Sequence, residues 1–181
     1  SGVRNMQAVL DLVWEKLLPT FQAKALPADR KNHELLTQRL ASLRVKKPTG
    51  ARAPGRSDLL GRQYEISTSF QKFESLRLDQ VGDETVLTIR QGGAEKRIVI
   101  GAEGWSRGEL VWGEFPKQPV AATGAWTAPD TYQARVCFVE EPFILDLTLK
   151  YAGEEVDFDA ALNVSFSLVK QPTLKGRVGT K

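Results

Sequence analysis

His33 and Cys137 are the only histidine and the only cysteine of the chain. A single cysteine excludes a disulfide framework and zinc sites built from several cysteines, and a single histidine excludes His-rich metal centres. Any Ser–His or Cys–His catalysis would depend on one candidate base. We interpret His33 as a partly exposed helix residue and Cys137 as a small hydrophobic residue of a strand. No cofactor or metal is expected.

Ser69 and Lys72 match the Ser-x-x-Lys pattern, in which a lysine one helical turn away activates a serine nucleophile. That chemistry requires a helix, because positions i and i+3 share a face only there. The tetrapeptide lies between two strand-like runs, so we interpret the match as chance.

Acidic residues gather towards the C-terminal end of the chain. Glu155, Asp157 and Asp159 alternate with Val156 and Phe158, which is typical of the solvated outer face of a strand. Glycosidase chemistry would need two carboxylates facing each other across a cleft. The pattern favours a solvated face.

Three tryptophans and a tyrosine form the one group for which a functional hypothesis stays open: Trp105, Trp112, Trp126 and Tyr132. Large aromatic side chains could stack on a sugar or line an apolar ligand site. They could equally fill the core of a small barrel. Both interpretations remain, and these four residues are the candidate ligand-binding set.

Composition is that of an ordinary globular protein. The chain has 181 residues, a formal net charge of +3, 41% hydrophobic and 26% charged residues, which indicates one domain or one domain with a short appendage. No apolar run approaches the ~20 residues of a membrane-spanning helix. Residues 44–62 hold six basic side chains and one acid but no aromatic, so we expect a solvated connecting loop and no nucleic-acid partner.

The beginning of the chain, Ser1-Gly2-Val3-Arg4, shows no signal peptide. A Ser-Gly start without methionine suggests either a piece excised from a longer protein or a remnant of cloning, and both alternatives stay open.

Residues 1–45 carry apolar side chains at helical spacing. A first helix should end at Pro19, and a second should begin after Asp29 as its N-cap. Both apolar faces are one-sided, so this helical segment is expected to pack on the rest of the protein. Residues 46–62 are the predicted basic Pro/Gly linker.

From residue 63 the apolar pattern changes to period two, with turn signals every ~8–12 residues and no helix between the runs. The predicted strands are 64–67, 73–78, 85–89, 97–100, 109–115, 120–126, 131–139, 143–151, 155–162 and 165–169. The predicted fold is therefore mainly β (α+β): an antiparallel lipocalin-like barrel or sandwich of about ten strands, residues 63–181, preceded by two α-helices. Whether its interior is filled or hollow stays open.

The order of several short phrases resembles the C-terminal, lipocalin-like, β-rich extension of bacterial serine hydrolases of the β-lactamase/penicillin-binding protein type. These phrases are Trp14-Glu-Lys-Leu-Leu-Pro19, Leu26-Pro27, Gly61-Arg-Gln-Tyr64, Leu76-Arg-Leu78, Gly104-Trp105, Gly124-Ala-Trp126 and Asp130-Thr-Tyr132. The resemblance implies a bacterial protein in the periplasm or outside the cell. It also implies that the catalytic residues belong to a preceding domain, and none is carried over to this chain.

Two functions follow as hypotheses. The first is a non-catalytic accessory domain that supports or positions a preceding serine-hydrolase domain. The alternative is a stand-alone barrel that binds an apolar or glycan ligand through Trp105, Trp112, Trp126 and Tyr132.

Overall fold

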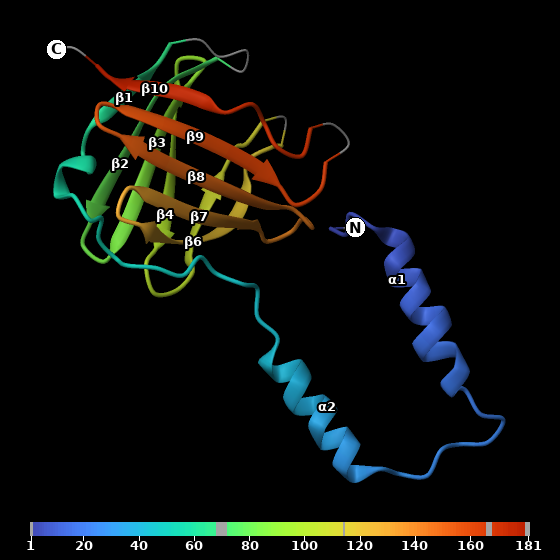
Figure 1. Ribbon diagram of the computed structural model, residues 1–181. Helices are drawn as coiled ribbons and strands as arrows, with labels where there is room; N and C mark the ends of the chain where they lie inside the picture. Colours follow the sequence, from blue (N-terminus) through green and yellow to red (C-terminus); the bar gives the residue numbers. More distant parts are fainter. Residues whose placement is uncertain (1, 68–71, 114, 166–167, 180–181) are drawn as a thin grey trace. The chain divides into compact units, whose positions relative to one another are not determined.

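The structure is a computed structural model that describes residues 2–67, 72–113, 115–165 and 168–179 (Figure 1). The chain divides into two compact units. One is a helical unit, Val3–Lys46, and the other is a barrel unit, which comprises Ser1–Gly2 and Lys47–Lys181.

The helical unit contains the two helices that the apolar spacing predicts. Helix α1 (Met6–Leu12) begins at Asn5, whose side chain accepts a hydrogen bond from the Ala8 amide, and α2 (Arg30–Ser42) begins at Asp29, which accepts from the Asn32 amide at 3.0 Å. These N-caps satisfy amides that have no partner within the first helical turn.

The end of the first helix is irregular. A π-helical turn, η1 (Val13–Leu17), and a 3₁₀ turn, η2 (Leu18–Thr20), follow α1. Pro19 has no amide proton to donate. Just before it, the Leu18 amide donates to the Val13 carbonyl, five residues back, and not to the carbonyl four residues back as in an α-helix. The regular helix therefore ends before the predicted Pro19 stop.

The described part of the barrel unit contains ten strands, nearly all paired antiparallel (Figure 1). They are β1 (Gln63–Ile66), β2 (Phe73–Val81), β3 (Glu84–Gln91), β4 (Ala94–Gly101), β5 (Ser106–Leu110), β6 (Gln118–Ala128), β7 (Thr131–Phe138), β8 (Ile144–Ala152), β9 (Glu155–Leu162) and β10 (Leu174–Val178). Their order is β4-β3-β2-β1-β10-β9-β8-β7-β6-β5.

A contact between β4 and β6 closes the barrel. Gly101 pairs with Thr123 in parallel, and the Thr123 hydroxyl donates to the Gly101 carbonyl at 3.0 Å. Nine strands thus form the ring, and β5 adds to β6 outside it. The predicted fold class, a mainly antiparallel barrel of about ten strands after two helices, is confirmed.

The last strand lies later than predicted. Of the predicted strand 165–169, residues 166 and 167 lie outside the described residues, and the described ones form no strand. The sequence of β10 shows no alternation of apolar and polar residues, because its core-facing residue is Gly176, which has no side chain. A Cβ there would lie 2.9 Å from Val156 and 3.1 Å from both Ile66 and Tyr64.

The segment predicted as a basic linker is held against the barrel, and we call residues 47–62 the strap. Ala51 and Trp126 exchange two backbone hydrogen bonds of 2.9 Å, and the amide of Gly55 donates to the Pro129 carbonyl at 3.1 Å. A short 3₁₀ turn, η3 (Ser57–Leu59), places Leu59 in the core with 1% of its surface exposed. The strap is irregular, as expected of a loop, but it belongs to the barrel unit.

Candidate functional site

The structure separates the four predicted ligand residues. Trp126 and Tyr132 are buried on neighbouring strands, and their ring centroids lie 5.3 Å apart. Trp112 is buried elsewhere, against Phe73, with centroids 6.2 Å apart. Trp105 is half-buried, and among the described residues it makes no ring contact with either group.

Two tyrosines that the sequence did not single out complete the first group. The Tyr151 ring lies 5.7 Å from that of Trp126 and 5.5 Å from that of Tyr64. We call Tyr64, Trp126, Tyr132 and Tyr151 the aromatic cluster. It contains all three tyrosines of the protein. Tyr64 lies on β1 and Tyr151 on β8, and these strands are not neighbours in the sheet. The two rings meet because the sheet curves into a barrel.

The aromatic cluster buries polar atoms without partners. The four side chains are 0–3% exposed. In the described structure, the Tyr151 hydroxyl and the indole nitrogen of Trp126 have no hydrogen-bond partner, whereas Arg62 and the Thr85 hydroxyl lie within reach of the Tyr64 and Tyr132 hydroxyls. Such atoms are rare in a protein interior, because an unsatisfied buried polar group costs about 1–3 kcal/mol.

Burial raises the pKa of all three phenols. It raises the pKa of Tyr132 to about 12, although the nearby Thr85 hydroxyl acts to lower it. Burial also raises the pKa of Tyr151, and that of Tyr64 against the opposing effect of Arg62. The cluster is therefore neutral at physiological pH.

Alkaline titration should show the raised pKa of the buried phenols directly. The phenols keep their protons in the folded state above the ordinary pKa of 10.0, whereas the unfolded chain releases them there. The stability that Tyr132 contributes is thus complete below pH ~10 and is lost as the pH rises towards about 12. We expect phenolate absorbance at 295 nm to stay flat through pH 10 and then to rise together with loss of circular dichroism. The urea-unfolded chain, as control, should titrate near pH 10. Phenolate formation near pH 10 in the folded chain would contradict the prediction.

The acidic residues of β9 lie on the outside of the barrel, alternating with the buried Val156 and Phe158. Most of their partners come from the neighbouring β10 or the segment before it. Lys175 lies 3.3 Å from Asp157, Lys170 lies 3.1 Å from Asp159, and the Thr173 hydroxyl donates to Asp159 at 2.6 Å. The carboxylates form a paired outer face and no facing pair across a cleft.

The remaining candidate catalytic residues are dispersed. His33 is exposed on α2, and Cys137 is half-buried on β7, where burial raises the pKa of its thiol. Ser69 lies outside the described residues, while Lys72 directly precedes β2 with a φ of 56°, which is not helical. Within the described ranges, no group of three or more His, Cys, Asp or Glu residues is placed to hold a metal ion.

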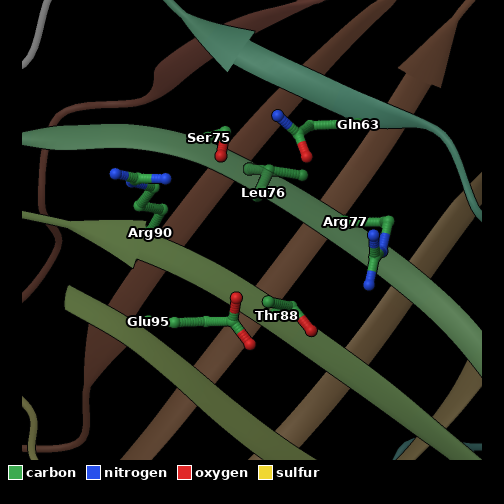
Figure 2. A pocket seen from close by; sticks show the side chains of 7 residues that line it. All are labelled: Gln63, Ser75, Leu76, Arg77, Thr88, Arg90 and Glu95. Atoms are coloured by element: carbon green, nitrogen blue, oxygen red, sulfur yellow. The ribbon is translucent and has the colours of Figure 1, made fainter. Parts of the chain in front are cut away.

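The surface formed by the described residues of the barrel includes the following two hollows. One, of about 80 Å³, lies on the sheet face formed by β1 to β4 (Figure 2). Its arginines already have partners: Arg77 pairs with Asp79 and Arg90 with Glu74, each at 2.8 Å. The other, of about 230 Å³, lies between strap residues such as Ala53 and the turn between β2 and β3. Both are smaller than the ~300–1,000 Å³ typical of small-molecule sites.

No family model matches the chain, and no curated protein matches it. Among solved structures, the chain is similar to a secretary abundant heat soluble (SAHS) protein from Ramazzottius varieornatus, with 8% sequence identity and a TM-score of 0.49. That match covers 74% of this chain and 100% of the SAHS chain. In the part of the chain that the structure describes, no helix has the length and apolar character needed to cross a membrane.

Proposed function

We propose that this chain is a non-catalytic accessory module that docks through its helical unit on a serine-hydrolase domain of the β-lactamase/penicillin-binding type. By the same resemblance, it works in a bacterial periplasm or outside the cell. The packing of the helices on the barrel stays a prediction.

The observation that carries the proposal is the exposure of the apolar residues in the helical unit. None of the residues in its helices is buried. The exposed large side chains include Met6, Val9, Leu10, Trp14, Leu17, Leu35, Leu36, Leu40 and Leu43, each 43–67% exposed. Apolar residues at helical spacing are typical of a helix that buries one face against a partner.

Charge indicates the chemistry of the partner surface. The helical unit has eight basic and four acidic residues, a net charge of +4, whereas the whole chain has +3. An apolar groove with acidic residues at its rim would complement these helices, because opposite charges at the rim steer association and fix orientation.

Binding to the catalytic domain tests the proposal. The probe is a serine-hydrolase domain of this type encoded in the same reading frame and produced as a separate chain. We expect it to bind the present chain, and the double substitution Leu36→Ser/Leu40→Ser to weaken binding at least about tenfold, because each buried leucine contributes about 1.5–3 kcal/mol. Isothermal titration calorimetry measures the affinity.

The matched control is Gln38→Ser, which changes the opposite face of α2 and should leave affinity unchanged. Equal binding by both variants, or a reading frame without such a domain, would contradict the docking role. The chain alone is expected to leave nitrocefin and p-nitrophenyl esters unhydrolysed. Hydrolysis that disappears with Ser69→Ala would contradict the non-catalytic role.

A further inference from the structure

Asn163 directly follows β9 and holds three separate parts of the barrel unit together. Its side-chain oxygen accepts a hydrogen bond from the Ile144 amide at 2.8 Å, and its backbone amide donates to the Ile144 carbonyl at 2.8 Å. Its side-chain nitrogen donates to the Pro142 carbonyl at 3.0 Å and to the Gly2 carbonyl at 3.2 Å. Asn163 thus joins the start of β8, the connection between β7 and β8, and the N-terminal end of the chain.

Gly2 fits closely against these groups because it has no side chain. A Cβ at position 2 would lie 2.6 Å from the Pro142 carbonyl oxygen and 3.2 Å from the side-chain nitrogen of Asn163. Any larger residue would therefore have to move away from the barrel. The first residues of a domain are usually poorly ordered unless contacts of this kind fix them. Gly2 belongs to the barrel unit, and the helical unit begins at the next residue.

The chain returns to the barrel at the opposite end, through the strap. Ala51 bonds to Trp126, which pairs with the beginning of β7, whereas Pro142 follows the end of β7. Because β7 has eight residues and a strand rises ~3.3 Å per residue, the two attachments lie about 25 Å apart along the barrel. The helical unit, Val3–Lys46, is therefore a loop of the chain whose two ends are attached at opposite ends of the barrel.

We infer that the Asn163 side chain is a latch that fixes the N-terminal end of the chain, so that the helical unit is held at both of its ends. A segment attached at one end only can take many directions from its anchor, and fixing the second end removes much of that freedom. Any partner of the helical unit then has less orientational freedom to lose on binding. The latch itself does not depend on the proposed docking role.

Amide NMR relaxation of the full chain tests the latch at Val3, the first residue of the helical unit. We expect the Val3 amide to have an order parameter near the rigid value of about 0.85 and Gly2→Ala to lower it below about 0.6, because the new Cβ displaces Gly2 from Pro142. Asn163→Asp should act in the same way, since an ionised carboxylate cannot donate to a carbonyl. Gly104→Ala is the matched control and should leave the Val3 order parameter unchanged, because a Cβ at Gly104 would have no neighbour within 4 Å.

The urea midpoint of the barrel distinguishes a latch from a contact that stabilises the barrel itself. Gly2→Ala changes only the N-terminal attachment, so the midpoint, followed by near-ultraviolet circular dichroism of the buried aromatic residues, should stay unchanged. If Asn163→Asp fails to fold, Gly2→Ala alone decides. A flexible Val3 amide in the unaltered chain overturns the inference, as does a Val3 amide that stays rigid in Gly2→Ala. A lowered midpoint for Gly2→Ala also overturns it, because Gly2 would then stabilise the barrel.

Discussion

Replacing Leu59 with alanine is expected to lower the free energy of unfolding by about 2–5 kcal/mol, the range for truncating a buried leucine. Leu59 is 1% exposed and belongs to the main hydrophobic core, although it lies in the irregular strap and not in a strand. Its truncation leaves a cavity in the core and removes the buried apolar contact of the strap. Urea unfolding followed by tryptophan fluorescence measures the change.

Leu168→Ala is the matched control, since Leu168 is 61% exposed in the same barrel unit. An exposed leucine loses little on truncation, so the control should change the free energy of unfolding by no more than about 0.5 kcal/mol. Similar values for the two variants would show that the strap does not anchor the core.

Gly124→Ala is expected to lower the free energy of unfolding by about 1–3 kcal/mol, the usual effect of overpacking a filled interior. A Cβ at Gly124 would lie 2.5 Å from the Tyr132 hydroxyl, 2.8 Å from the Gln133 carbonyl oxygen and 2.9 Å from Ile100. The carbonyl belongs to the paired backbone of β7 and cannot move without disturbing the sheet. Chemical denaturation measures the loss.

Gly108→Ala provides the comparison, because Gly108 lies on β5 and a Cβ there would have no neighbour within 4 Å. In a strand with open space, alanine is no worse than glycine. If Gly124→Ala proved as stable as Gly108→Ala, the close approach of Tyr132 to β6 would be refuted.

Local patterns in the sequence predicted the elements well wherever side chains alternate. Along β8, Leu145, Leu147, Leu149 and Tyr151 are buried in turn, as the period-two rule requires. Asp29 caps α2 as expected, because an N-cap depends only on a few adjacent residues. Prediction failed at β10, where the inward-facing residue is Gly176 and leaves no apolar signal. It also placed the strand at 109–115 too late, since β5 spans Ser106–Leu110 and residues 111–113 form no strand.

The site was harder to predict because it depends on pairing between distant strands. The sequence grouped Tyr132 with three tryptophans, whereas the structure joins it with Trp126 and two tyrosines. Tyr64 reaches Tyr151 across the interior, and no spacing along the chain encodes that contact. The attachment of the strap to the barrel could not be predicted either, because Ala51 bonds to Trp126 through backbone atoms and this contact needs no particular side-chain pattern.

The pairing of β1 with β10 has a consequence for the order of folding. Tyr64, near the start of the barrel sequence, lies opposite Val178, near its end. Contacts between residues so far apart close a long loop, and domains rich in such contacts fold slowly. During synthesis on a ribosome, the hairpins from β2 to β9 can form as they emerge, but β1 lacks its second neighbour until β10 is made. The barrel should therefore complete its ring only after β10 has left the ribosome, with the edges of β1 and β9 open until then.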